Sequence, residues 1–356
     1  MVAEYKTKSY FCLSTNYNKM RIEQNYSLEQ HNTFHIPVKT RWFIEYNNEE
    51  ELQRVLHDEY FQECLSLHIG SGSNLLFLND YNGIIFHSNI KGVNLVEETD
   101  NSVLLRIGAA EKWDDVVAYA VSNGWSGIEN LSLIPGETGA AAIQNIGAYG
   151  VEIKDVVETV ETYNQLSFEK RIFTNKECEY AYRRSYFKNE HNDPHIVTYV
   201  NLRLQKNTQF SINYGNLKEE LAKYPEITLA TIREAVIAIR KEKLPDPAVL
   251  GNAGSFFMNP LISIEHFERI KKQYPSIPFY PTTENKIKIP AGWLIEQCGF
   301  KGKSHGSVGV YEKQALVLVN LGDAKGHEIA LVAESIRSAV NERFGIELMP
   351  EVKYVG

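Results

Sequence analysis

The feature that most constrains the fold of this chain is a run of small residues at positions 133–150, LIPGETGAAAIQNIGAYG. Its glycines are Gly136, Gly139, Gly147 and Gly150. Glycine adopts backbone conformations that other residues resist, and it lets a flat or phosphorylated ligand lie against main-chain N–H groups. The alanines at 140–142 predict a helix whose positive N-terminal end faces that ligand. A tight turn followed by a closely packed helix explains the same pattern, so this run alone leaves both readings open.

A second loop of small residues, GSGSNL at 70–75, follows a predicted strand at 65–69. N–H and hydroxyl donors at the end of a strand are suited to a pyrophosphate. The loop is not a dinucleotide fingerprint of the GxGxxG kind, because Phe77 and Leu78 stand where a third glycine and a helix are needed. The two loops belong to separate predicted units, so a ligand that touches both must be about as long as a dinucleotide.

Composition narrows the class of protein and of partner. With 356 residues the chain is long enough for two or three domains, and 43% hydrophobic with 23% charged residues is typical of a globular protein. A net charge of −8 argues against a nucleic-acid surface and favours small-molecule partners. The four cysteines form no CxxC pair, which favours reduced thiols over a disulfide frame or a metal site. No apolar run predicts a membrane span or a signal peptide, and we expect a cytoplasmic protein.

Hydrophobic periodicity predicts alternating strands and helices along the chain. Asn48 and Asp323 are expected to cap helices, and Gly124 to end one. Strands are expected at 40–46, 65–69, 83–87, 103–107, 156–163, 167–173, 195–204, 315–320 and 348–355, and further helices at 112–123, 227–241 and 264–274. Residues 1–19 are polar without clear periodicity, and Met20 is the expected native start, so the first segment is interpreted as a non-native or disordered extension.

Several long motifs occur in the order seen in one family. They are GSGSNLL, NLSLIPGETGAAAIQNIGAYG, YAYRRSYFK at 180–188, KLPDPAVLGNAGSFFMNP at 243–260, AGWLIEQCGFKG at 291–302 and LMPEVKYVG at the end. Over residues 20–356 the chain resembles the UDP-N-acetylenolpyruvoylglucosamine reductases, type I subgroup. Many motifs in register make a chance match very improbable, whereas any one motif could mislead.

The resemblance implies an α+β fold, with an FAD-binding part of the vanillyl-alcohol oxidase type and a third, substrate-binding α/β domain. The implied first FAD subdomain is 20–88. The second is 89–244, joined by a C-terminal strand at 345–356, and the substrate domain is 245–344. A monomer is expected.

The resemblance also implies the reaction and its cofactors. NADPH would reduce FAD, and the enolpyruvyl ether of a UDP-sugar would then take a hydride at one vinyl carbon and a proton at the other, completing a peptidoglycan precursor. Neither glycine loop holds a histidine or cysteine, so FAD is expected to be non-covalent. The implied FAD-binding residues are Gly70, Ser71, Gly72, Ser73, Asn74, Leu75, Pro135, Gly136, Gly139, Gln144, Asn145, Gly147 and Ala148.

Three residues match the family's catalytic positions. Ser255 matches the proton donor; a serine serves there only because the hydride adduct is a strongly basic, enolate-like carbanion. Arg183 and Glu351 match residues that polarise the substrate carboxylate and stabilise the developing charge. Arg184 adjoins Arg183, and since adjacent residues of a strand face opposite ways, only one of the two can point into the site. From the residues alone, spacing favours Glu351 as a solvated residue of a closing strand, and the alternative interpretation of Ser255 is a capping or turn hydroxyl.

Substrate binding is expected from side chains that otherwise look like ordinary surface residues. They are Tyr214, Lys243, Asn259, Tyr280, Lys301 and Gln314, with Tyr214 matching the lid tyrosine of the type I subgroup. His35 departs from the family, in which many members have glycine. An FAD-linked oxidase of the same superfamily, and a non-catalytic flavin or UDP-sugar sensor, are the alternative interpretations.

Overall fold

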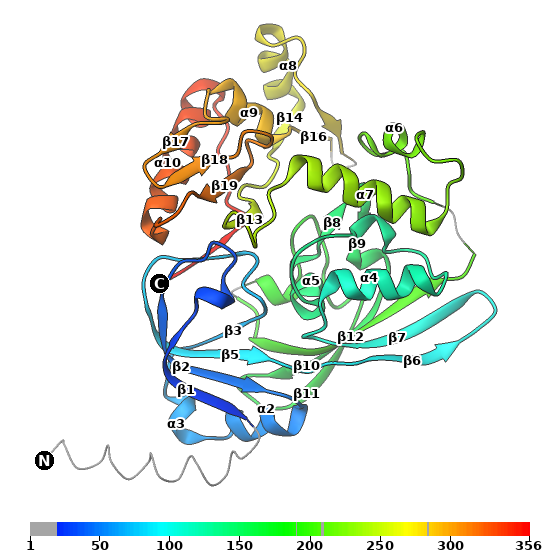
Figure 1. The fold of residues 1–356 in the computed structure, drawn as a ribbon, viewed down its shortest axis with the longest axis vertical. Helices are drawn as coiled ribbons and strands as arrows, with labels where there is room; N and C mark the ends of the chain where they lie inside the picture. Colours follow the sequence, from blue (N-terminus) through cyan, green and yellow to red (C-terminus); the bar gives the residue numbers. More distant parts are fainter. Residues whose placement is uncertain (1–19, 190, 208–209, 283–284) are drawn as a thin grey trace, which may run out of the picture.

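The computed structural model describes residues 20–189, 191–207, 210–282 and 285–356. These residues form two sheets side by side, with a third α/β part above them (Figure 1). The proposed extension at 1–19 lies outside the described residues.

The first sheet has the strand order β1-β2-β5-β3. Its strands are β1 (Arg21–Ser27), β2 (Lys39–Tyr46), β3 (Ser66–Ile69) and β5 (Tyr81–Ser88), accompanied by η1 (Glu29–His31), α2 (Glu49–Leu56) and α3 (Glu59–Gln62). As predicted, Asn48 caps α2, where its Oδ1 accepts the Glu51 N–H at 2.9 Å. Strand β2 is buried on both faces, because Phe43 belongs to one hydrophobic core while Trp42 and Ile44 belong to another.

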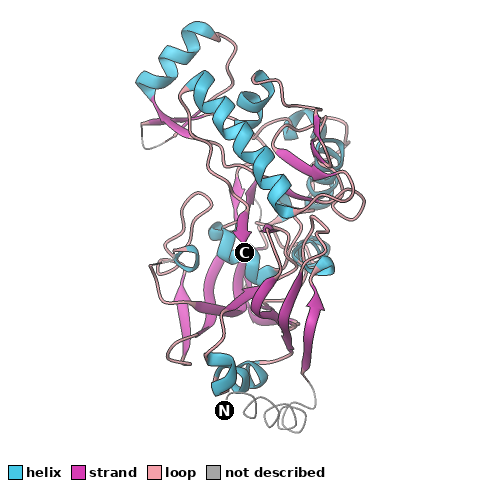
Figure 2. Ribbon diagram, turned by 90° about the vertical axis from the view of Figure 1, so that its left-hand side faces the viewer, coloured by secondary structure: helices cyan, strands magenta, loops and turns pink. Residues whose placement is uncertain are grey.

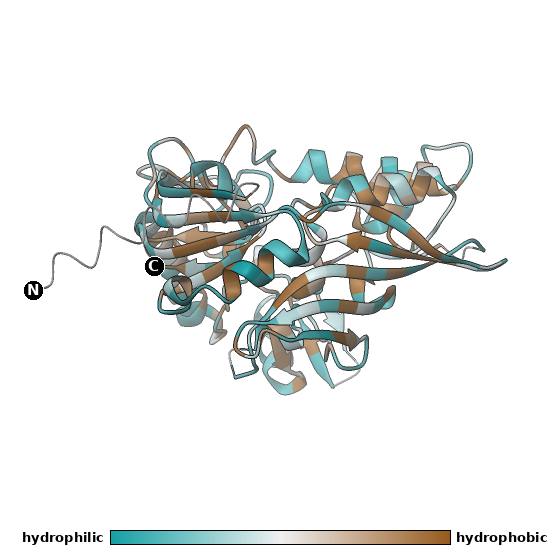
Figure 3. Ribbon diagram, turned by 90° about the horizontal axis from the view of Figure 1, so that it is seen from below, coloured by the Kyte–Doolittle hydropathy of each residue, from teal (hydrophilic) through white to brown (hydrophobic). Residues whose placement is uncertain are grey.

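The second sheet is antiparallel, with the order β11-β10-β12-β7-β6. Its strands are β6 (Val93–Glu98), β7 (Ser102–Gly108), β10 (Val157–Asn164), β11 (Lys170–Thr174) and β12 (His195–Gln205). Hydrophobic and hydrophilic residues alternate along these strands (Figure 3), as expected for a sheet that buries one face. Over it lie α4 (Trp113–Ser122), α5 (Thr138–Gln144), η2 (Glu129–Leu131), η3 (Ile153–Asp155), η4 (Tyr186–Lys188) and the small pair β8 (Gly147–Ala148) and β9 (Val151–Glu152). The predicted alanine-rich helix is therefore α5.

The third part begins after α6 (Leu217–Leu221) and α7 (Leu229–Lys243). One small sheet joins β13 (Asn252–Ser255), β19 (Val317–Asn320), β18 (Val308–Val310) and β17 (Ser304–His305), and another joins β14 (Leu261–Ser263), β16 (Lys286–Lys288) and β15 (Tyr280–Pro281). The helices are α8 (Ile264–Gln273), α9 (Ala291–Gln297) and α10 (Gly326–Phe344). Figure 2 shows these helices gathered at the end away from the two large sheets.

Two predictions about this part were wrong. Asp323 does not cap the long helix, because α10 begins at Gly326 and its N-cap is Lys325. The C-terminal strand does not join residues 89–244, because β20 (Lys353–Val355) pairs in parallel with β4 (Leu75–Phe77), which directly follows the first glycine loop. One hydrophobic core accordingly contains residues from both ends of the chain, among them Phe77, Phe256 and Val352.

No helix formed by the described residues combines the length and the apolar character needed to cross a membrane.

Candidate active site

The two glycine loops touch each other, as a shared ligand would require. Ser73 Oγ donates to the carbonyl of Pro135 at 3.3 Å, and a Cβ added at Gly136 would lie 3.0 Å from Ser73 Oγ. A Cβ added at Gly70 would lie 2.8 Å from Glu137 Oε2 and 3.6 Å from the Ala140 methyl. The N-terminal end of α5 therefore sits against the first loop.

The first loop has the properties of a cofactor cradle. Gly72 has a φ of +70°, and a side chain there would collide with the carbonyl of His31. Ser71 Oγ and Thr33 Oγ1 are buried and have no hydrogen-bond partner among the residues that the structure describes. Buried hydroxyls are normally satisfied, so two orphaned ones at one loop indicate a place where a bound ligand supplies acceptors. The residues present thus fit a phosphate-bearing cofactor such as FAD.

Arg183 lies in a tight turn rather than in a strand. Ala181 and Arg184 exchange backbone hydrogen bonds of 3.0 and 2.9 Å, and between them Arg183 adopts a left-handed φ of +53°. Only a few per cent of non-glycine residues adopt this conformation, and it is often associated with functional sites. The turn directs the Arg183 guanidinium to carbonyls of the second glycine loop and leaves Arg184 exposed.

Asn145 fixes this turn against the glycine cradle. It ends α5 in a left-handed conformation with a φ of 45°, and its side-chain amide donates to the Ala181 carbonyl at 2.8 Å and to Glu152 at 3.2 Å. Arg183 in turn donates to the carbonyls of Asn145 at 3.3 Å and Gly147 at 2.9 Å. The guanidinium and the cradle backbone are therefore one connected unit.

Glu351 meets Arg183 from the other end of the chain. Arg183 Nε lies 2.8 Å from Glu351 Oε1. The Nε–H is not directed at this oxygen, so the contact is an ion pair without a hydrogen bond. Glu351 was predicted within a strand, but it lies in a bend just before β20. Its carbonyl accepts from the side chain of Asn74 in the first glycine loop at 3.0 Å.

Ser255 is brought to the same place by backbone pairing. It ends β13, and the carbonyl of the next residue, Phe256, accepts the Glu351 N–H at 2.8 Å. Gly254 just before it has a φ of +67°, a conformation that favours glycine. The three predicted catalytic residues, which are far apart in sequence, thus lie on three contacting segments.

Sequence reasoning missed three cations around this centre. Lys188 donates to Gln144 Oε1 at 2.7 Å, and burial lowers its pKa, a shift that Glu351 partly offsets while Arg183 adds to it. Burial also lowers the pKa of Lys288, whose Nζ lies 4.9 Å from the centre of the Tyr182 ring. Burial lowers the pKa of Arg240, which contacts the Leu133 carbonyl at 3.3 Å. In a chain of net charge −8, this local positive charge suits an anionic ligand.

Half of the predicted substrate residues lie near this centre. Tyr214 stacks on Tyr280 with ring centres 5.8 Å apart, and burial raises the pKa of Tyr214 with a smaller contribution from Tyr280 and Tyr182. Asn259 is hydrogen-bonded to Tyr182 and also accepts the N–H of Ala291 at 2.9 Å.

The other three contact residues other than Arg183 and Ser255 among the described residues, although Gln314 contacts Leu316, which adjoins the register partner of Ser255. Lys243 lies 3.4 Å from Asn216 in the Tyr214 loop, Lys301 pairs with Glu296 at 3.1 Å, and Gln314 accepts the N–H of Leu316 at 3.3 Å. His35 has a φ of +58°, which explains why glycine suits its position, and its ring bonds the Pro247 carbonyl at 2.8 Å.

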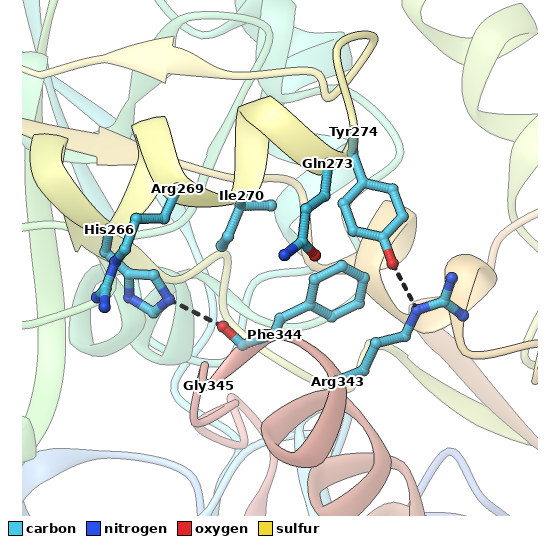
Figure 4. A pocket seen from close by; sticks show the side chains of 8 residues that line it. All are labelled: His266, Arg269, Ile270, Gln273, Tyr274, Arg343, Phe344 and Gly345. Atoms are coloured by element: carbon cyan, nitrogen blue, oxygen red, sulfur yellow. Dashed lines mark hydrogen bonds between the residues drawn. The ribbon is translucent and has the colours of Figure 1, made fainter.

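A separate hollow of about 320 Å³ lies between α8 and the end of α10 (Figure 4). It contains none of the predicted site residues. His266 is bonded to the Phe344 carbonyl at 2.8 Å, and Arg343 Nε to the Tyr274 hydroxyl at 3.0 Å. His266 and Arg343 thus already have hydrogen-bond partners within the protein, so we place the candidate active site at Arg183 and the glycine loops.

Comparison with known proteins finds a matching family model for each half of the chain. Residues 246–355 match the family model described as UDP-N-acetylenolpyruvoylglucosamine reductase, C-terminal domain, and residues 41–165 match an FAD binding domain. The UDP-N-acetylenolpyruvoylglucosamine reductase of Bacteroides fragilis is 50% identical over 334 residues, which covers 94% of this chain and 100% of that protein. The protein of the same name from Porphyromonas gingivalis is 50% identical over 337 residues, with the same coverage.

A solved structure supports the fold. The crystal structure of the UDP-N-acetylenolpyruvylglucosamine reductase from Thermus caldophilus matches with a TM-score of 0.67 at 22% identity, covering 95% of this chain and 100% of that one. The α+β, FAD-binding fold expected from the sequence is confirmed by this match and by the FAD binding domain.

Proposed function

The chain belongs to the UDP-N-acetylenolpyruvoylglucosamine reductase family, and from that premise we propose that it reduces the enolpyruvyl ether of this UDP-sugar with NADPH, by way of FAD. It is an FAD-dependent oxidoreductase of peptidoglycan precursor synthesis. NADPH as the reductant, the roles of individual residues, a monomeric state and a cytoplasmic location are parts of the proposal.

The observation that carries the proposal is the convergence of Arg183, Glu351 and Ser255 beside the glycine cradle. When bound, FAD would supply the hydride that reaches one vinyl carbon of the substrate. Gly70 to Leu75 would hold the pyrophosphate, and the residues from Pro135 to Ala148 the rest of the cofactor. Arg183 is tied to the cradle through the carbonyls of Asn145 and Gly147, so its charge is fixed relative to the cofactor.

Arg183 would face the substrate carboxylate. A guanidinium held by two carbonyls and Glu351 is preorganised, so it stabilises charge developing on the carboxylate without reorganising during the reaction. Ser255, on the segment paired with Glu351, would donate the proton to the adjacent carbon. Lys188 and Lys288 would add positive charge for an anionic substrate. The Tyr214 loop, stacked on Tyr280, would cover its diphosphate.

The test is spectroscopic. The purified protein should be yellow and should release FAD on denaturation. Under anaerobic conditions NADPH should bleach the flavin absorbance, and the enolpyruvyl UDP-sugar should restore it. Rapid restoration by oxygen with no response to the UDP-sugar would support an oxidase instead. A protein that binds both ligands but shows no substrate-driven restoration would be a sensor.

A further inference from the structure

Three partly or fully buried ionisable side chains, Glu45, His87 and Glu137, lie beside the first glycine loop and take no part in the proposed chemistry. His87 on β5 is the register partner of Glu45 on β2, and its Nδ1 lies 2.9 Å from Glu45 Oε2. Its other ring nitrogen, Nε2, lies 3.5 Å from Oε1 of Glu137, the residue just before α5. The His87 imidazole thus bridges one carboxylate on β2 and another at the start of α5.

The second oxygen of Glu137 faces the cofactor cradle. A Cβ added at Gly70 would lie 2.8 Å from Glu137 Oε2, so this oxygen borders the loop with the orphaned Ser71 hydroxyl. Glu137 is only 9% exposed, and it makes no side-chain cap of α5. Its carboxylate is therefore held in place by His87 and directed at the cradle.

The surroundings of His87 decide its charge. Burial lowers its pKa, but the contacts with Glu137 and Glu45 outweigh burial and raise it overall. His31 faces it edge-on at 5.1 Å and hydrogen-bonds Tyr26 at 3.0 Å, and burial together with His87 lowers the pKa of His31 to about 4. His31 is therefore neutral when His87 is protonated. This environment also contains Arg21, which lies near His31. The Phe43 ring stacks on His87 with ring centres 6.0 Å apart.

A bare carboxylate beside a phosphate-binding loop would repel the cofactor, and protonated His87 reduces that repulsion. With His87 charged, the three groups carry one net negative charge instead of two. An ionised carboxylate can only accept hydrogen bonds, so Glu137 can recognise a donor and not a phosphate. The donors that FAD carries next to its pyrophosphate are hydroxyl groups of the ribose and the ribityl chain.

We propose that Glu137 accepts a hydrogen bond from a sugar hydroxyl of FAD, and that His87, backed by Glu45, is a positioning residue that orients this carboxylate and balances its charge. The inference rests on the proposed function only in taking FAD as the cofactor.

The experiment measures the dissociation constant of FAD from the apoprotein by fluorescence titration, between pH 6 and 9. At pH 6, where protonated His87 balances the Glu137 carboxylate, Glu137→Ala removes the acceptor and should weaken FAD binding roughly ten- to hundredfold, which is the effect of losing one hydrogen bond to a charged acceptor. In the wild type, binding should weaken as the pH rises through the raised pKa of His87, because deprotonation leaves two uncompensated carboxylates beside the phosphates. His87→Gln should remove this pH dependence.

Matched controls are His57→Gln and Glu63→Ala, which alter exposed side chains of the same unit and should leave both affinity and pH profile unchanged. Thermal unfolding of each apoprotein separates a folding defect from a binding defect. Wild-type affinity in Glu137→Ala, or an undiminished pH dependence in His87→Gln, would overturn the inference while leaving the proposed function intact. A wild-type apoprotein that takes up no FAD would overturn both.

Discussion

At the scale of single residues, the proposed site centres on Arg183, whose guanidinium is held by two carbonyls and one carboxylate. A lysine keeps the charge but cannot make these contacts together, because its ammonium group is a compact point donor. Arg183→Lys should therefore slow substrate-driven reoxidation by roughly ten- to hundredfold, from the loss of about 1.5 to 3 kcal/mol in hydrogen bonding to charged groups. Single-turnover absorbance measurements would show it.

Arg184→Lys is the matched control for that variant. Arg184 is exposed and lies on the other side of the same turn, so its replacement should leave both half-reactions near wild-type rates. Equal losses in the two variants would mean that the turn, and not the Arg183 guanidinium, is what the reaction needs.

The choice between these two arginines shows what the sequence could not decide. The motif singled out the pair, but alternation along a strand was the wrong physical picture, since Arg183 occupies a left-handed turn fixed by Asn145, which lies 38 residues earlier. Contacts between distant segments are not readable from local pattern. The same reason explains why Lys188 and Lys288, inside or beside recognised motifs, were not predicted to lie near Arg183.

At the scale of elements, the Tyr214 loop should act as a cover for the substrate. Tyr214 is 38% exposed and stacks on Tyr280 of β15, so the loop bridges two parts of the molecule. Tyr214→Phe keeps the ring but removes one hydroxyl. The apparent affinity for the UDP-sugar should weaken by ~1.5 to 3 kcal/mol, with flavin content unchanged.

Steady-state KM values and the flavin absorbance of the purified variant check this. Tyr119→Phe, which alters an exposed tyrosine of α4, is the control and should behave as the wild type. An unaltered KM for Tyr214→Phe would show that the loop is only a linker.

Local pattern predicted elements well where burial is periodic and poorly where pairing is distant. Strands β2, β5, β7 and β12 and helix α4 were foreseen because their apolar residues repeat at strand or helix spacing. The last strand was predicted at 348–355, but β20 spans only Lys353–Val355. Its bounds depend on pairing with β4, which is distant in sequence. The cap of α10 was misplaced because Asp323 resembles a capping residue, although the helix starts only after Lys325.

At the scale of the whole molecule, Glu161 helps to hold the two large sheets together. It receives a bidentate contact from Arg106 at 2.6 and 2.9 Å, and it also lies 2.9 Å from Lys170. Lys170 in turn lies 2.9 Å from Glu49 on α2 of the first unit. Burial alone would raise the pKa of Glu161, but the Arg106, Lys170 and Asn201 hydrogen bonds lower it to about 2.

Glu161→Gln should therefore destabilise the protein in a pH-dependent way. Because the folded pKa lies below the unfolded value of about 4.5, the stabilisation is present in full above that value and is lost as the pH falls toward 2. Chemical denaturation at pH 7 should show a loss of about 2 to 3 kcal/mol, and the difference from the wild type should shrink below pH 4.5. Glu158→Gln, in an exposed pair with Arg203, should cost under ~1 kcal/mol. A pH-independent loss would contradict the assignment.

The measurement that tests the central claim most directly divides the catalytic cycle of Ser255→Ala at the flavin. Reduction by NADPH needs no proton donor to carbon, whereas reoxidation by the enolpyruvyl UDP-sugar does, so only the second step should suffer. Stopped-flow absorbance should show bleaching at close to the wild-type rate and reoxidation slower by ~100-fold or more, the usual scale for a positioned acid–base group. Normal turnover in the variant, or equal loss of both half-reactions in a folded, flavin-loaded protein, would contradict Ser255 as the proton donor.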